Sequence, residues 1–126
     1  MSYRLTIVVP VYNEEDNLQR VEKEFLTYFE MATVSCKVLF VNDGSKDNSQ
    51  ELIEEICSRD NRFTYISFAK NAGLSAAIKA GFDYTDTELV GYIDADLQTT
   101  PEDFNKLLGE MDDCALVTGV RADRKD

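Results

Sequence analysis

Short apolar runs alternate with segments of helical periodicity along the chain, and this alternation limits the possible folds more than any other feature. The runs are rich in Val, Ile, Phe and Tyr and are almost continuously apolar, as parallel strands buried on both faces are. The order β-α-β-α-β-α-β-α-β predicts an α/β fold, an open, mainly parallel sheet with helices on both faces. The five predicted strands are Leu5–Val11, Val38–Val41, Phe63–Phe68, Leu89–Ile93 and Ala115–Val120.

The segments between these runs carry apolar residues three or four positions apart, which is the spacing of one helix face. Two start signals support helices here: Thr100 stands before Pro101 as a capping hydroxyl, and Asp47 precedes the second segment. In the third segment we assign Gly73 and small residues such as Ala77 to close packing of a helix on the sheet. The predicted apolar faces are Leu18, Val21, Phe25 and Phe29; Leu52, Ile53, Ile56 and Cys57; Leu74, Ala77, Ile78 and Phe82; and Phe104, Leu107, Leu108 and Met111.

The charge balance excludes several classes of function. The 126 residues, 44% of them hydrophobic, suffice for one domain with a buried core. They include 24 acidic and 13 basic side chains and no histidine, which gives a net charge of −11. This negative surplus argues against nucleic acid as a partner, and the lack of histidine removes Ser-His-Asp and Cys-His catalysts. Acid–base or metal chemistry must therefore use carboxylates.

Cysteine usage and hydropathy predict a cytoplasmic protein. Cys36, Cys57 and Cys114 are odd in number and form no C-x-x-C pattern, so we interpret them as core residues in a reducing compartment. No signal peptide precedes the first apolar run, and no apolar stretch is as long as a membrane span.

Ligands of open parallel sheets bind beyond the carboxyl ends of the strands, so the residues that follow each run are the candidate site. The first of these turns has three acids, Glu14–Asp16, and no glycine, which makes it unsuitable for phosphate. A nucleotide would instead bring its base and ribose here, with Tyr12 stacking on the base and Glu14 accepting from sugar hydroxyls. Alternatively, these acids only stabilise the positive end of a helix dipole.

Three further strand ends each allow two interpretations. Asn42–Ser45 is either an Asx turn with a left-handed glycine, or it presents Asp43 as an acceptor for a base N–H. Asn71 contacts a ligand or simply precedes a packed helix. Arg121 and Arg124 bind a phosphate in bidentate fashion or belong to a solvated basic tail.

Asp94 and Asp96 follow the fourth run and give the strongest chemical signal. In an extended chain their carboxylates share one face about 6.6 Å apart, where two full charges repel by about 2.5 kcal/mol at an effective dielectric near 20. A hard divalent cation, Mg²⁺ or Mn²⁺, would offset this repulsion, and Gln98 could add an amide oxygen. The alternative is two exposed aspartates in an acidic loop.

Four motifs in this order and spacing resemble the family 2 glycosyltransferases, whose GT-A fold is Rossmann-like. They are Val8–Glu15, Val41–Ser45, Asn71–Gly73 and Asp94–Gln98. The resemblance extends over nearly the whole chain but covers only the amino-terminal, nucleotide-binding half of that family. We therefore expect residues 1–126 to be the nucleotide-sugar-binding part of a longer chain, with a truncated GT-A domain.

The resemblance implies roles for individual residues. Pro10, Tyr12 and Glu14 line the base and ribose pocket, and Asp43 contacts the base. Asp96 is the catalytic residue that ligates Mg²⁺ or Mn²⁺ on the diphosphate, with Asp94 and Gln98 as further ligands. The nucleotide-sugar-binding residues predicted in total are Pro10, Tyr12, Glu14, Asp43, Asn71 and Asp94.

The motif around Asp96, together with the late arginines, is most similar to enzymes that transfer a hexose to a polyprenyl phosphate. This implies an inverting transfer from a UDP- or GDP-sugar, with Arg121 and Arg124 near the acceptor phosphate. It also implies a role in cell-envelope glycan synthesis at the cytoplasmic face of the membrane, with membrane association only through a missing carboxyl-terminal part. The general base of the family lies beyond residue 126, so this chain alone is expected to bind the donor without transfer.

Two alternatives remain. One is a UDP-sugar transferase that acts on a saccharide or cell-envelope glycan. The other, from a different class, is a non-catalytic nucleotide-binding or receiver-like signalling domain. A receiver domain needs a phosphoacceptor aspartate after the third strand, where this chain has Phe68-Ala69-Lys70.

Overall fold

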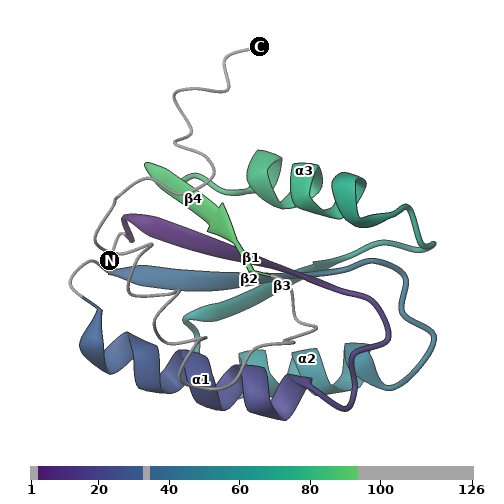
Figure 1. Cartoon of the computed structure of the whole chain (residues 1–126), viewed down its shortest axis with the longest axis horizontal. Helices are drawn as coiled ribbons and strands as arrows, with labels where there is room; N and C mark the ends of the chain where they lie inside the picture. Colours follow the sequence, from purple (N-terminus) through teal and green to yellow (C-terminus); the bar gives the residue numbers. More distant parts are fainter. Residues whose placement is uncertain (1–2, 33–34, 94–126) are drawn as a thin grey trace.

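A computed structural model describes residues 3–32 and 35–93, which form one sheet with helices packed on it (Figure 1). The predicted fourth helix and the predicted fifth strand, Ala115–Val120, lie outside the described residues. The described elements are β1 (Leu5–Val11), α1 (Leu18–Met31), β2 (Cys36–Asn42), α2 (Ser49–Arg59), β3 (Phe63–Ser67), α3 (Leu74–Tyr84) and β4 (Leu89–Tyr92).

The four strands are all parallel and stand in the order β3-β2-β1-β4. Leu5 of β1 is in register with Cys36 of β2 on one side and with Leu89 of β4 on the other. The connections through α1 and α2 lead in one direction across the sheet, from β1 to β2 and then to β3. The connection through α3 returns past β1 to β4 on the other side. Because such crossovers are right-handed, α1 and α2 cover one face and α3 covers the other (Figure 1). The predicted α/β architecture is confirmed.

An aromatic cluster forms the core between the sheet and the pair α1 and α2. Phe63 of β3 stacks on Phe40 with ring centroids 5.8 Å apart and meets Phe25 of α1 edge-on at 6.4 Å. Phe29 lies 5.5 Å from Phe63, and the guanidinium of Arg62 covers the Phe29 ring at 4.4 Å. Successive residues of β1 and β2 point alternately to this face and to the opposite face, and nearly all of them are buried, which explains the nearly continuous apolar runs.

Small residues let α3 pack closely on the other face of the sheet. Ala77 is fully buried against Val8 and Val41, as predicted. A Cβ on Gly81 would lie 2.5 Å from Cγ1 of Val8, so this glycine also belongs to the contact. The packing role predicted for Gly73 is wrong, because a Cβ there would meet no atom within 4 Å. Its φ of 105° is the reason for glycine at that position.

β1 lies between β2 and β4, although the helices that precede β2 and β4 are on opposite faces. This is the topological switch point of the sheet, and ligands of such sheets bind at its carboxyl edge. β4 ends beside β1, where Ile93 donates its N–H to the carbonyl of Val8 at 3.0 Å. None of the described helices has the length and apolar character required to cross a bilayer.

Candidate functional site

A pocket of roughly 240 Å³ opens at the carboxyl edge of the sheet, between the loops that follow β1, β2 and β3. It brings together all five of the predicted nucleotide-binding residues that the structure describes. The other predicted site residues, Asp94, Asp96, Gln98, Arg121 and Arg124, lie outside the described part of the chain. The pocket is lined by Pro10, Val11, Tyr12, Glu14, Asp43, Asn71, Gly73 and Leu74.

The loop after β1 is held by the loop after β2. Its Asn13 adopts a left-handed φ of 55°, and its Oδ1 accepts the N–H of Lys46 at 2.8 Å. Three consecutive backbone N–H groups of the loop donate to side chains of the loop after β2 and of the first residue of α2. They run from Asn13 to Ser45 Oγ (2.9 Å), from Glu14 to Ser49 Oγ (2.9 Å) and from Glu15 to Asp47 Oδ2 (3.2 Å). These donors are already paired, so they do not form a phosphate cradle.

The three acids of this loop lie in the turn before α1, and the first turn of the helix itself contains no acid. Glu14 accepts a hydrogen bond from the Asn17 side chain at 2.7 Å, and Asn17 is the N-cap of α1. The Glu14 carboxylate therefore lines the pocket in a fixed position. Tyr12, with 41% of its surface exposed, lines the same pocket.

Asp43 directs its carboxylate at the start of α3. The residue is only 4% exposed, and Oδ1 accepts the N–H of Ala72 at 2.7 Å. Oδ2 accepts the N–H of Gly73 at 3.0 Å and the side-chain amide of Asn71 at 2.9 Å. The Asn71 amide also lies 3.1 Å from the Asp43 carbonyl oxygen. We call these four hydrogen bonds between Asp43 and residues 71–73 the Asp43 clasp.

The clasp also compensates for the missing cap of α3. The N-cap of this helix is Gly73, which has no side chain to accept an N–H. The Asp43 carboxylate accepts the two N–H groups just before the helix, where the helix dipole favours a negative charge.

The turn after β2 is made by Asn42 and not by Asp43. Asn42 Oδ1 accepts the N–H of Ser45 at 3.0 Å, which closes the turn that the sequence predicts at Asn42–Ser45. The Asn42 amide donates to Gln50 at 2.7 Å, and Ser67 of β3 donates to the same Gln50 oxygen at 2.6 Å. Asp43 is thereby left to point at the neighbouring loop.

Gly44 is required in this turn for two reasons. Its φ of 70° is left-handed, as predicted, and a side chain would collide with the loop after β3. A Cβ would lie 2.4 Å from the backbone nitrogen of Asn71 and 2.5 Å from the carbonyl carbon of Lys70. The loops after β2 and β3 can therefore pack this closely only because residue 44 is a glycine.

Asp47 contributes to the start of α2 from one residue before the cap. The N-cap is Asn48, whose side chain makes no capping bond, whereas Asp47 Oδ1 accepts the N–H of Ser49 at 2.9 Å. Burial would raise the pKa of Asp47, but hydrogen bonds from Ser49 and Glu15 outweigh it and hold this pKa below its usual value. Asp47, the predicted capping residue, therefore does accept an N–H at the start of α2, although the N-cap position itself is Asn48.

Sequence reasoning missed the contacts of Asn13, Ser45 and Ser49 that join the first two loops. The only signal was indirect: Asn13 and Ser45 are small polar residues close to predicted strand ends, and Ser49 follows the predicted cap Asp47. Their partners are 32 to 35 positions apart in the chain, a separation that no local pattern identifies.

The metal ligands predicted after β4 fit a divalent cation by their chemistry. Two carboxylates and an amide are oxygen donors that suit Mg²⁺ or Mn²⁺. Within residues 3–32 and 35–93 no group of three or more His, Cys, Asp or Glu side chains could hold a metal ion.

A family model supplies the class of the protein. The model of "Glycosyl transferase family 2" matches residues 6–126. The chain therefore belongs to this family, which confirms the predicted resemblance and excludes the receiver-like alternative.

A curated relative has a more specific description. The "Undecaprenyl-phosphate 4-deoxy-4-formamido-L-arabinose transferase" of Proteus mirabilis (strain HI4320) is 34% identical over 119 residues, or 94% of this chain. The matched region is 36% of that protein, so the chain spans little more than a third of the relative's length.

Solved structures confirm the GT-A fold. TarS 1–349 of S. aureus in complex with UDP-GlcNAc superposes with a TM-score of 0.61 at 19% identity, over 87% of this chain and 31% of that one. The mannosyltransferase PcManGT of Pyrobaculum calidifontis, in complex with GDP-Man and Mn²⁺, also gives 0.61 at 20% identity, over 89% of this chain and 33% of that one.

Proposed function

We propose that this chain is the donor-binding part of a glycosyltransferase that moves a hexose from a nucleoside-diphosphate sugar to a polyprenyl phosphate. One observation carries the proposal. In a chain of glycosyl transferase family 2, a single pocket at the sheet's switch point is lined by every described residue predicted to bind the nucleotide.

The pocket suits a nucleoside better than a phosphate. The exposed Tyr12 ring offers a surface on which a base can stack, and the fixed Glu14 carboxylate can accept from ribose hydroxyls. Asp43 has one of its roughly four lone-pair positions uncommitted by the clasp and can accept a base N–H there. The acids of this loop would repel the diphosphate, which must lie toward the residues after β4.

Asp94, Asp96 and Gln98 follow β4 and would hold a divalent cation against that diphosphate. When bound, Mg²⁺ or Mn²⁺ supplies charge neutralisation of the departing nucleoside diphosphate. The structure of PcManGT in complex with GDP-Man and Mn²⁺ supports this assignment. UDP-GlcNAc in TarS and GDP-Man in PcManGT support a UDP- or GDP-sugar as the donor.

The acceptor proposal rests on the relative from Proteus mirabilis, whose name specifies undecaprenyl phosphate. A phosphate acceptor is already ionised near neutral pH, so its attack on the sugar needs no general base. Arg121 and Arg124 are suited to pair with that phosphate in bidentate fashion. The product would enter cell-envelope glycan synthesis at the cytoplasmic face of the membrane, where the rest of the protein provides the membrane contact.

Titration calorimetry with UDP and GDP, each with and without Mn²⁺, tests donor binding. We expect one nucleotide to bind with a clear dependence on Mn²⁺. Asp96→Asn should remove that dependence and leave the fold intact, whereas the matched change Asp16→Asn, at an exposed site before α1, should not. No metal-dependent binding of either nucleotide would refute the proposal.

The acceptor is tested with the whole protein and a radiolabelled donor sugar. Transfer to undecaprenyl phosphate, and none to undecaprenol or to free saccharides, is the expected result. Transfer to a saccharide instead would favour the alternative of a glycan acceptor.

A further inference from the structure

The Asp43 clasp fixes the orientation of a carboxylate that lines the pocket. The main chain of Asp43 is tied to β1, because its N–H donates to the carbonyl of Val11 at 2.8 Å. Its two carboxylate oxygens are tied to the next loop by the N–H groups of Ala72 and Gly73. One side chain, the amide of Asn71, contacts both the main chain and the carboxylate of Asp43.

This double contact distinguishes Asn71 from the two backbone donors. A single amide nitrogen that donates to both the Asp43 carbonyl (3.1 Å) and Oδ2 (2.9 Å) restricts rotation of the carboxylate relative to its own main chain. Gly44 permits the arrangement, since any side chain there would displace the Asn71 backbone. Both hydrogen bonds of the Asn71 amide nitrogen therefore go to Asp43, and this nitrogen is not left to donate to a ligand.

We propose that Asn71 is a positioning residue, which acts on the bound nucleotide through Asp43 and not by direct contact. This differs from the direct contact expected from the sequence. The inference rests on the proposed function, because the ligand that Asp43 serves is the nucleoside diphosphate. The clasp sets where the free lone pair of Asp43 lies before the ligand arrives, and this preorganisation lowers the cost of binding.

A double-mutant cycle on nucleotide affinity separates positioning from contact. The purified protein is titrated with UDP or GDP in the presence of Mn²⁺ as wild type, Asn71→Ala, Asp43→Ala and the double variant. Asn71→Ala should weaken binding about tenfold, as loss of one hydrogen bond to a carboxylate predicts. In the Asp43→Ala background the same change should alter affinity by less than about twofold, since Asn71 then has no carboxylate to hold.

A pH series on Asn71→Asp gives a second readout and does not require the Asp43 variants to fold. Near pH 8 the new carboxylate repels Asp43 and has no proton to donate. Acidification that adds one proton to this pair of carboxyl groups restores a donor between them. The other titratable groups nearby, Glu14 and Tyr12 of the pocket lining and the neighbouring Lys70, are present in every variant. Affinity relative to wild type should therefore recover on acidification in Asn71→Asp and not in Asn61→Asp, a matched change at an exposed turn before β3.

Each result has a defined meaning. A tenfold loss that is equal in both Asp43 backgrounds, or no loss in Asn71→Ala, overturns the positioning role while leaving the proposed function in place. Absence of recovery in Asn71→Asp also overturns it. If wild type binds neither nucleotide, the proposed function fails and this inference fails with it.

Discussion

At the scale of single residues, this site depends on two glycines that serve different purposes. Gly44 has both a left-handed φ and backbone atoms where its Cβ would stand. Gly73 has a φ of 105° but open space around it. The first glycine permits close contact between two loops, whereas the second only permits a backbone conformation at the start of α3.

Alanine at these two positions should therefore have unequal costs. Gly73→Ala should lower the free energy of unfolding only through backbone strain at this positive φ, by about 1–3 kcal/mol. Gly44→Ala introduces a similar backbone strain and also forces the Lys70–Asn71 backbone to move. This displacement should lower the free energy of unfolding by roughly a further 1–3 kcal/mol. Urea unfolding of both variants measures the difference. Equal losses of stability would contradict the collision at Gly44.

At the scale of the elements, the apolar pattern was enough to predict every described strand and helix, β1 to β4 and α1 to α3, but not how their loops meet. Strand and helix periodicity is local, so residues such as Phe25, Ile53 and Ala77 could be assigned to buried faces, and all three are buried. The Asp43 clasp joins residues 28 to 30 positions apart, and the sequence could not reveal which of Asn42 and Asp43 closes the turn. The pocket residues were predictable because topology alone places strand ends at one edge.

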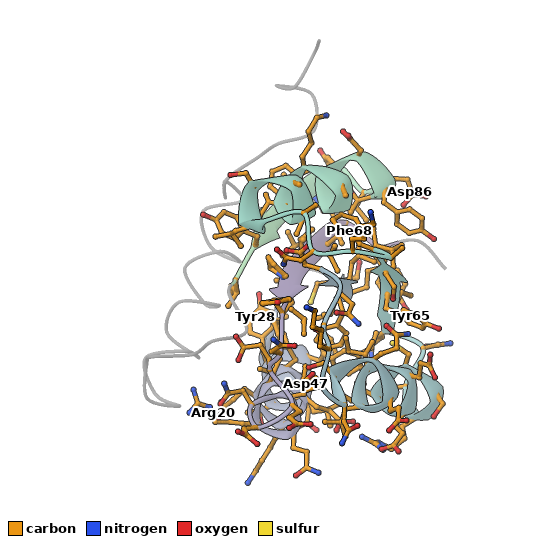
Figure 2. The ribbon with its side chains drawn as sticks, turned by 90° about the vertical axis from the view of Figure 1, so that its right-hand side faces the viewer. Arg20, Tyr28, Asp47, Tyr65, Phe68 and Asp86 are labelled. Atoms are coloured by element: carbon orange, nitrogen blue, oxygen red, sulfur yellow. The ribbon has the colours of Figure 1, made fainter. Side chains whose placement is uncertain are left out.

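Asp47 joins the loops that precede α1 and α2, and Figure 2 shows it between the ends of these two helices. Asp47→Ala should lower the unfolding free energy near pH 7 by about 1–2 kcal/mol, since the N–H groups of Glu15 and Ser49 lose their acceptor. The pKa of Asp47 is lowered from 3.8 in the folded state. Its contribution is therefore complete above that value and is lost as the pH falls through the lower folded pKa.

Urea unfolding of wild type and Asp47→Ala at several pH values checks this sign. The stability gap should be constant between about pH 5 and pH 7 and should shrink below about pH 4. Asp16→Ala, at an exposed aspartate in the turn before α1, is the matched control and should show almost no gap. A gap that grows on acidification would mean that the Asp47 carboxylate destabilises the fold.

At the scale of the whole molecule, charge is the dominant feature. The chain has 24 acidic and 13 basic side chains, and the five ion pairs found among the described residues each involve an exposed partner. Exposed pairs contribute about 0–1 kcal/mol each. The unpaired negative charge acts over the whole surface and opposes the compact state. In the proposed function, the same surplus is the reason that an anionic sugar donor would require a cation at the edge of this sheet.

Salt should therefore stabilise the protein even though it weakens each ion pair. Raising the ionic strength from about 0.01 M to 0.1 M shortens the Debye length from about 30 Å to about 10 Å, which screens repulsion between distant acids. We expect the unfolding free energy, measured with urea, to rise over this range and to rise equally in NaCl and KCl. A fall would mean that the local pairs, such as Arg59 with Glu22 at 2.7 Å, outweigh the net repulsion. A rise confined to one salt would indicate binding of a particular ion and would contradict general screening.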